Sequence, residues 1–431
     1  MITNEEKQEF LDLLHREVVP AIGCTEPMAV ALCVAKAVEE LRNILGKERG
    51  YMPEKISLRL SANILKNAMG VGIPGTGGMI GLPIAIALGA IGGKSCLELE
   101  VLRDCSESDL ASAKEYIKEN HIDIKLEEND PDKLYIHVKA ESEGKSAEAT
   151  IKRSHTHFVD NSSVDSSAPC TEELQDGPSL KLYKVYEFAT TMPLDEIRFI
   201  LESKKLNEAA AREGLRENYG HQLGKTMCSP LGRGIMGESI FAKVLSVTSC
   251  ACDARMAGAK IPVMSNSGSG NQGICATMPV VVFAHENHNT EEELIRALTL
   301  SHLTAIYIKQ SLGSLSALCG CVVASTGSSV GITYLMGGNY DQICYSVKNM
   351  IANLTGMICD GAKPSCALKL TTGVSTAVMS AMLAIQNNHV TSAEGIIDDD
   401  VDCSIRNLTS IGSKGMDETD RFVLDIMTHK K

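Results

Sequence analysis

Apolar residues recur at helical spacing along two early stretches, residues 7–17 and 28–45. Short segments of β-forming residues follow them and alternate with a polar helical stretch. The first part of the chain is therefore predicted to be mixed α and β. The predicted strands are residues 55–62, 96–102, 122–126 and 134–140, and the polar helix is residues 107–119.

The stretch 158–178 is rich in Ser, Asp and Pro and can bury little apolar surface. We place a domain boundary there, with an α+β domain at residues 1–165 and an all-helical domain at residues 180–431. The overall fold class is predicted to be α+β. Helical periodicity beyond the boundary covers residues 194–217, 240–257, 290–311, 341–357 and 370–386.

Two uncharged stretches, residues 67–93 and 310–340, exceed the roughly 20 residues that a membrane span requires. The first is broken by prolines and glycines, and the second carries Gln, Cys, Ser and Thr throughout. Neither has an aromatic belt or a basic flank. Buried helices joined by glycine-rich loops are favoured, and a membrane transporter is the alternative from another class.

The charge composition limits the classes of partner that the protein is expected to bind. The net charge of −13 disfavours nucleic acid and anionic membranes, so a small-molecule partner is expected. The first residues, MITNEEKQEF, lack the basic start and apolar stretch of a signal peptide, which predicts a cytoplasmic protein. The 15 cysteines are then expected to be reduced, and many of them to be small buried residues.

Among the 15 cysteines, Cys359 and Cys366 are the strongest candidates for a metal-binding role. Pro364 ends any helix that precedes it, and a new helix is predicted to begin near Cys366. Both thiols would then face one short loop, where they could bind iron. Their spacing matches no common zinc or ferredoxin motif, so a purely structural role stays open.

Two closely spaced cysteine pairs lie elsewhere in the chain. Cys319 and Cys321 flank a glycine in a predicted small-residue helix, where residues two apart point about 200° apart. Only one of the two could then face a given site. The same argument predicts that Cys250 and Cys252 are core residues.

The segment AIGCTEP places Cys24 before a predicted helix whose first residue would be Pro27. Thr25 and Glu26 could cap that helix. A thiol at the positive end of a helix is expected to have a lowered pKa and to act as base, nucleophile or ligand. The alternative is a buried cysteine at a helix start.

Glycine-rich segments at residues 73–81 and 265–273 offer backbone N–H groups that could grip a carboxylate or phosphate. Neither fits the dinucleotide-binding pattern, and tight turns between helices are an equal alternative. His155 and His157 lie in a strand-like segment, where they share one face. A structural or substrate-edge role is expected for them.

The motifs AIGCTEP, PGTGG, SNSGSGNQG, ALCGCVVASTG and MICDGAKPSCALK occur in this order over residues 17–380. Together they resemble the L-cysteine desulfidase family, relatives of the iron-sulfur L-serine dehydratases. The resemblance implies an α+β domain followed by an all-helical, cluster-binding domain. It also implies a 4Fe-4S cluster held by Cys319, Cys359 and Cys366 with one iron open to substrate, and Cys24 as a catalytic thiol.

The implied reaction converts L-cysteine to pyruvate, ammonia and hydrogen sulfide, and relatives suggest a homodimer. An L-serine dehydratase is the nearest alternative, followed by a pyridoxal phosphate lyase and a noncatalytic thiol-rich protein. Some serine dehydratases place a C-terminal cysteine on the cluster, but here the last cysteine is Cys403. The expected substrate-binding residues are Thr25, Glu26, Asn63, Thr76, Gly77, Asn266, Ser267, Ser269 and Asn271.

Overall fold

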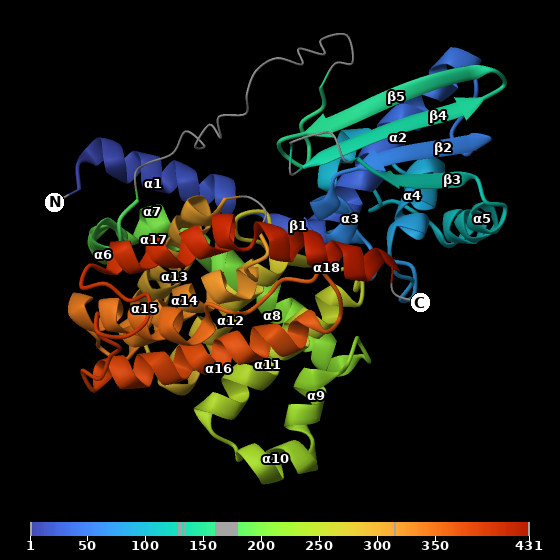
Figure 1. Ribbon diagram of the computed structural model, residues 1–431. Coiled ribbons are helices and arrows are strands. Elements are labelled where there is room, and N and C mark those ends of the chain that lie inside the picture. The colour runs from blue at the N-terminus through green and yellow to red at the C-terminus, as the bar shows by residue number, and fades with distance from the viewer. Residues whose placement is uncertain (1, 128–131, 133, 160–179, 314–315, 430–431) are drawn as a thin grey trace.

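A small sheet flanked by helices lies beside a larger helical body in the computed structural model (Figure 1). The structure describes residues 2–127, 132, 134–159, 180–313 and 316–429. The mixed α+β fold class and the helical C-terminal region are confirmed. The elements of the α+β part are α2 (Thr25–Leu45), β2 (Lys55–Leu60), α3 (Ala62–Ala68), α4 (Leu82–Ile91), a 3-10 helix (Ser95–Glu100), α5 (Glu107–Lys118), β3 (Ile122–Leu126), β4 (Tyr135–Ser142) and β5 (Lys145–Lys152).

Within the described residues, four strands form this sheet in the order β3-β2-β4-β5. β2 runs parallel to β3 and antiparallel to β4, and β4 continues through a tight turn into β5. Along β4, buried residues alternate with half-buried ones, which places Ile136, Val138 and Ala140 on one face. That face packs against α2, and α4 lies beside α2 (Figure 1).

Three of the predicted strands are confirmed, and the strand predicted at residues 96–102 is wrong. That segment is a 3-10 helix, because Ser95 is held by hydrogen bonds from its backbone N and its Oγ to the Glu39 carboxylate at 2.9 and 2.5 Å. Glu98 also adopts a positive φ of 48°, which interrupts any extended conformation. β5 was not predicted because its sequence, KSAEATIK, is too polar to resemble a strand.

The helical body contains every helix segment predicted after residue 180, with shifts at the ends. Its central helices carry many small residues and approach each other closely. The helices are α1 (Asn4–Glu17), α6 (Leu182–Thr191), α7 (Leu194–Ile197), α8 (Leu201–Arg216), α9 (Leu223–Cys228), α10 (Pro230–Met236), α11 (Ile240–Met256), α12 (Gly270–Glu286), α13 (Glu291–Leu312), α14 (Gly320–Leu335), α15 (Tyr340–Leu354), α16 (Cys366–Ile385), α17 (Val401–Ser410) and α18 (Asp417–His429).

Two groups of buried apolar residues form the interior. The smaller lies between the sheet and the helices α2 and α4. The larger fills the helical body and includes Phe10 and Leu14 of α1 as well as Cys24. The N-terminal helix therefore packs on the helical body (Figure 1). A division into domains at residues 165–180 stays a prediction, and residues 160–179 lie outside the described residues.

A short strand pair ties the segment before α2 to the helical body. β1 (Pro20–Ile22) runs antiparallel to β6 (Pro262–Met264), which leads into the loop before α12. The pairing continues on one side, because Ser265 N donates to Val19 O at 2.9 Å and Ser267 N donates to Glu17 O at 3.0 Å. The start of α2 is therefore fixed beside the loop at residues 265–269.

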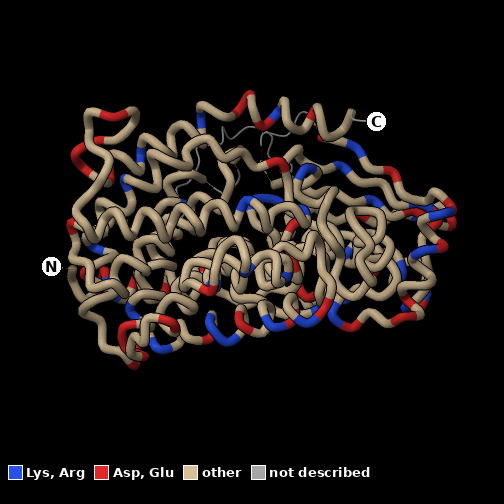
Figure 2. The backbone as a smooth tube through the Cα atoms, turned by 90° about the horizontal axis from the view of Figure 1, so that it is seen from below, with Lys and Arg blue, Asp and Glu red and all other residues tan. Residues whose placement is uncertain are grey.

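Charged residues of both signs are interspersed along the outer elements, and the central helices carry few of them (Figure 2). In the described part of the chain, α16 is the one helix long and apolar enough to cross a membrane by length and composition. Half of its apolar window is buried inside the protein.

The close contact of α8 with α11 at Gly214 should contribute to the stability of the helical body. An added Cβ at Gly214 would lie 2.0 Å from the backbone oxygen of Cys250 on α11, so Gly214→Ala must separate the two helices. We expect a loss of about 1–3 kcal/mol and a lower unfolding temperature. Gly234→Ala on α10 is the control, since nothing lies within 4 Å of its added Cβ. Equal unfolding temperatures for the two variants would contradict this packing.

Candidate active site

Two of the candidate cysteines are brought together by backbone pairing. Leu318 and Ile358 form an antiparallel bridge. Cys319 N donates to Met357 O at 3.0 Å, and Cys359 N donates to Ala317 O at 2.6 Å. Cys319 and Cys359 therefore lie on the same face as diagonal neighbours, a relation that separates residues by about 7–8 Å in antiparallel pairs. The helix predicted at residues 341–357 ends at Leu354 instead.

Cys366 is the first residue of α16, as predicted from the proline before it. Burial, together with the charges of Cys319 and Cys359, raises the pKa of the Cys366 thiol to about 11. Burial and Cys319 also raise the pKa of Cys359. Because Cys366 responds to the charges of Cys319 and Cys359, and Cys359 to that of Cys319, the three cysteines share one region.

The expectation that Cys319 lies inside a helix is wrong, because it precedes α14 as the N-cap residue. The 200° separation therefore does not apply to Cys319 and Cys321. A hydrogen bond from the Cys321 side chain lowers the pKa of Cys319 to about 7, although burial alone would raise it. Cys319 is thus the thiol of this group most easily deprotonated.

Among the described residues, no group of three or more His, Cys, Asp or Glu side chains is placed so that it could hold a metal ion. The cysteines that hold a cluster bind different iron atoms and stand further apart than the ligands of one ion. Three neighbouring thiols, one with a lowered pKa, suit a cluster better than a single ion.

Lysines surround the three thiols. Lys66 of α3 is buried and pairs with Asp420 of α18, and its charge lowers the pKa of Cys359. Lys369 pairs with Asp360 in the loop between the cysteines. Burial raises the pKa of the Asp360 carboxyl, but hydrogen bonds from two lysines outweigh it and lower that pKa to about 2. Fixed positive charge of this kind favours thiolates.

Cys24 is the N-cap residue of α2 and makes no side-chain capping bond. The helix begins at Thr25, so Pro27 is its third residue and not its first, as had been predicted. Thr25 Oγ1 donates to Gly268 O at 2.8 Å, which ties the helix start to the loop before α12. Cys24 Sγ donates to Glu26 Oε2 at 3.3 Å.

The expectation of a lowered pKa at Cys24 is wrong. The thiol is 5% exposed, and burial raises its pKa well above the usual value. The carboxylate of Glu26 raises it further, and the charge of Arg255 lowers it only in part. The helix N-terminus cannot offset full burial beside a carboxylate. The charge of Cys366 also raises the pKa of Cys24 slightly, so the thiol lies within electrostatic range of the three-cysteine group.

Most polar side chains of the loop at residues 265–271 serve the loop itself. Asn266 Nδ2 lies 3.0 Å from His302 Nδ1 in the helical core, and Ser267 Oγ donates to Asn266 Oδ1 at 3.0 Å. Ser269 caps α12. Asn271 differs, because its Oδ1 accepts from the side chain of Arg255 at 2.9 Å. Substrate contacts by these residues stay predictions.

The polar side chain of Thr76, in the glycine-rich loop at residues 73–81, also makes its hydrogen bonds within its own loop. Thr76 Oγ1 donates to Ile73 O at 2.7 Å and accepts from Met79 N at 3.1 Å, so this hydroxyl stabilises its own turn. Gly77 has a φ of 69° and open space around it. Asn63, one turn before Lys66 on α3, has a buried Oδ1 without a hydrogen-bond partner. Substrate contacts by Thr76, Gly77 and Asn63 likewise stay predictions.

His155 and His157 lie in a turn after β5 and not in a strand, so the expected shared face does not exist. The Nε2 of His155 is enclosed and has no hydrogen-bond partner. Burial lowers the pKa of His155, and the charge of Glu26 partly offsets this effect. A histidine from the α+β part therefore lies near the Cys24 and Glu26 pair.

Sequence reasoning missed two further residues with unpaired buried atoms, Arg255 Nε and Gln272 Oε1. Arg255 lies near the end of α11, and Gln272 lies in the first turn of α12 against Gly320. A signal for the arginine was present, because a charged residue in an otherwise apolar helix is rarely buried without a function.

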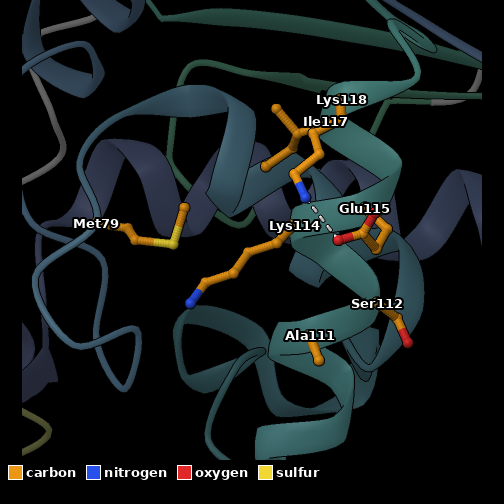
Figure 3. A pocket seen from close by; sticks show the side chains of 7 residues that line it. All are labelled: Met79, Ala111, Ser112, Lys114, Glu115, Ile117 and Lys118. Atoms are coloured by element: carbon orange, nitrogen blue, oxygen red, sulfur yellow. Dashed lines mark hydrogen bonds and ion pairs between the residues drawn. The ribbon is translucent and has the colours of Figure 1, made fainter.

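A surface hollow lies elsewhere, along α5. It encloses about 620 Å³ and is lined by Lys114, Lys118 and Met79 among others, with Lys118 paired to Glu115 (Figure 3). A second hollow of about 360 Å³ lies beside α15. None of the candidate residues lines either hollow.

A family model for the serine dehydratase alpha chain matches residues 97–425, which is more than half of the chain. The chain belongs to the serine dehydratase alpha chain family. Proteins named "UPF0597 protein" from Phocaeicola vulgatus and Bacteroides thetaiotaomicron are 64% and 63% identical over the whole chain and 100% and 99% of their own lengths. One from Porphyromonas gingivalis is 49% identical over 99% of both chains.

Membership of the serine dehydratase alpha chain family indicates an enzyme of the dehydratase or lyase kind, related to the iron-sulfur serine dehydratases. The matched range contains all three candidate cysteine ligands and begins after Cys24. The N-terminal segment with Cys24 is covered by the full-length relatives.

His302 contacts Asn266 and so helps to hold the loop at residues 265–271. Its burial should make the stability of the protein depend on pH. Burial lowers its pKa to about 3, against about 6.5 in unfolded chains. Between these values the unfolded state binds more protons, so stability falls as the pH falls from 6.5 to 3, by about 1.4 kcal/mol per unit of pKa difference. His302→Gln should be less stable at pH 7 and should lose less stability on acidification.

Denaturant unfolding at several pH values measures this effect. His285→Gln is the control, because this side chain is 84% exposed, and it should keep the wild-type slope. An unchanged slope in His302→Gln would mean that His302 is not held neutral by burial.

Proposed function

We propose that this protein is an iron-sulfur L-cysteine desulfidase, a lyase that converts L-cysteine to pyruvate, ammonia and hydrogen sulfide. The observation that carries the proposal is the position of Cys24. Its thiol is close enough to Cys366 of the three-cysteine group for their charges to interact, and it donates a hydrogen bond to Glu26. A group that could take the α proton is thus near the cysteines that would hold the cluster.

Cys319, Cys359 and Cys366 are the residues proposed to hold a 4Fe-4S cluster. When bound, such a cluster supplies a Lewis-acidic iron with an open position for a departing thiolate. The charges of Lys66 and of Lys369 on α16 lower the pKa of Cys359 and partly offset the effect of its burial. No carboxylate or imidazole is required as a ligand.

Cys24 and Glu26 are proposed to move the α proton. The Glu26 carboxylate accepts the thiol proton through the 3.3 Å hydrogen bond, which leaves a thiolate at Cys24. That thiolate removes the proton from the substrate α carbon while the bond from the β carbon to sulfur breaks. The sulfur leaves with the electron pair and takes up a proton as sulfide. The remaining aminoacrylate is hydrolysed to pyruvate and ammonia.

The raised pKa of Cys24 makes the proton transfer depend on bound substrate. In the substrate-free site the thiol keeps its proton, so Cys24 is shielded from oxidation and unwanted alkylation. Substrate has to supply positive charge before the thiolate becomes stable, and the α-ammonium group can do so. The base would therefore be formed only when an amino acid is bound.

An L-serine dehydratase is the second candidate, and the name of the matched family favours it. The same proton acceptor would then act on a substrate that loses hydroxide in place of sulfide. Turnover of L-serine and L-cysteine by one anaerobic preparation separates the two, since our proposal expects a higher kcat/KM for L-cysteine.

The ligand assignment is tested by Cys359→Ala. Removing one of three thiolates should abolish both bound iron and sulfide release, measured by iron analysis and a sulfide assay under anaerobic conditions. Cys96→Ala is the matched control, because this cysteine is exposed in the 3-10 helix and should retain both properties. Sulfide release by Cys359→Ala without iron would contradict the proposal.

The role of Cys24 is tested by Cys24→Ala. This variant should keep its iron and lose about 10²–10⁴-fold in kcat, because only the proton acceptor is missing. Exchange of the α hydrogen of L-cysteine with deuterium from solvent, followed by mass spectrometry, should also stop. Glu26→Gln should slow the same exchange. Normal exchange in Cys24→Ala would assign the proton transfer to another group.

A further inference from the structure

Arg255 is a buried cation near the end of α11 that is 3% exposed. Its Nη1 donates to Asn271 Oδ1 at 2.9 Å and to Met256 Sδ at 3.3 Å. Its Nε is buried without a hydrogen-bond partner. Among the residues that the structure describes, no carboxylate forms an ion pair with Arg255, and even the Oδ1 of nearby Asp253 has no partner.

A buried charge without a counter-ion costs several kcal/mol, so proteins rarely keep one unless a ligand completes it. Guanidinium is the cation best suited to a carboxylate, since its N–H groups form a planar fork that binds both oxygens. Asn271 fixes one arm of the fork and leaves Nε available. The arginine is therefore held in one orientation with an unfilled donor.

The surroundings of Arg255 also favour an anion. An added Cβ at Gly270 would lie 2.3 Å from Arg255 Nε, so only glycine allows the guanidinium to lie against the first turn of α12. The N-terminus of this 17-residue helix contributes further N–H donors and a positive end. Thr25, the residue after Cys24, donates to Gly268 O at 2.8 Å, two residues before Gly270. The guanidinium and the start of α2 therefore contact the same loop, and the charge of Arg255 also acts on Cys24.

We infer that Arg255 binds the α-carboxylate of the amino acid substrate and so restricts the site to free α-amino acids. This inference rests on the proposed function for its location, and its chemistry follows from the unpaired guanidinium. With the carboxylate on Arg255, the adjacent α carbon is kept close to Cys24. The glycine-rich loops then support this fork and do not by themselves supply the carboxylate site.

The test compares L-cysteine with cysteamine, which has the same thiol and amine and lacks the carboxylate. In the anaerobic holoenzyme, Arg255→Gln should raise the KM for L-cysteine by about 30-fold or more, with a smaller change in kcat. The inhibition constant of cysteamine should stay within about threefold of wild type. Iron content should be unchanged. Arg233→Gln on α10, with a side chain 54% exposed, is the control and should alter none of these values.

An unchanged ratio of KM for L-cysteine to the inhibition constant of cysteamine would overturn the inference. Loss of iron in Arg255→Gln would also overturn it, since the arginine would then serve the cluster. If this variant does not fold, Arg255→Lys keeps the charge without the planar fork. It should show the same selective rise in KM, and a wild-type KM in Arg255→Lys would count against the inference.

Failure of the proposed function is distinguishable from failure of this inference. If the wild type acts on L-serine, ethanolamine replaces cysteamine in the same comparison. If the wild type acts on neither amino acid, L-cysteine becomes an unreactive probe. A rise in unfolding temperature with L-cysteine but not with cysteamine, lost in Arg255→Gln, would then support the inference. An equal rise with both compounds would overturn it.

Discussion

The antiparallel pairing of β1 with β6 is the contact on which the arrangement of the candidate site depends. It is short, but it joins segments that lie about 240 residues apart and is extended by hydrogen bonds from Ser265 and Ser267. It holds the start of α2 against the helical body, where Cys24 is close enough to Cys366 for their charges to interact. The ion pair between Lys66 of α3 and Asp420 of α18 also joins the α+β part to the region of the three cysteines.

The site keeps polar atoms buried without partners, which most of the interior avoids. Asn63 Oδ1, His155 Nε2, Arg255 Nε and Gln272 Oε1 all belong to elements that surround Cys24 or the cysteine loops. Each unsatisfied atom costs about 1–3 kcal/mol. Such costs are tolerated at functional sites, where a ligand restores the missing bonds. These four unpaired atoms are therefore candidates for contact with substrate groups.

Periodicity predicted much of the fold. The long helices and three strands follow from regular apolar spacing, and the start of α16 at Cys366 follows from the proline before it. The strand predicted at residues 96–102 failed because contacts of Ser95 with Glu39 override local propensity. The prediction that Cys319 lies inside a helix was wrong for another reason. Small residues continue on both sides of the start of α14, so the local sequence does not mark where the helix begins.

The candidate site was only partly predictable. Resemblance to a known family singled out the cysteines, and sequence alone could not supply their pKa values. Cys24 has the helix position that was predicted, but its burial comes from distant segments and reverses the expected pKa shift. Arg255 was not recognised as a site residue because its lack of partners is a property of the folded structure.

The central claim is that Cys319, Cys359 and Cys366 hold a cluster with one iron open to the sulfur of L-cysteine. Mössbauer spectroscopy of anaerobic protein labelled with iron-57 tests it most directly. The account predicts a 4Fe-4S spectrum in which one iron differs from the other three and shifts when L-cysteine is added. A protein without iron, or a cluster whose spectrum L-cysteine leaves unchanged, would contradict it.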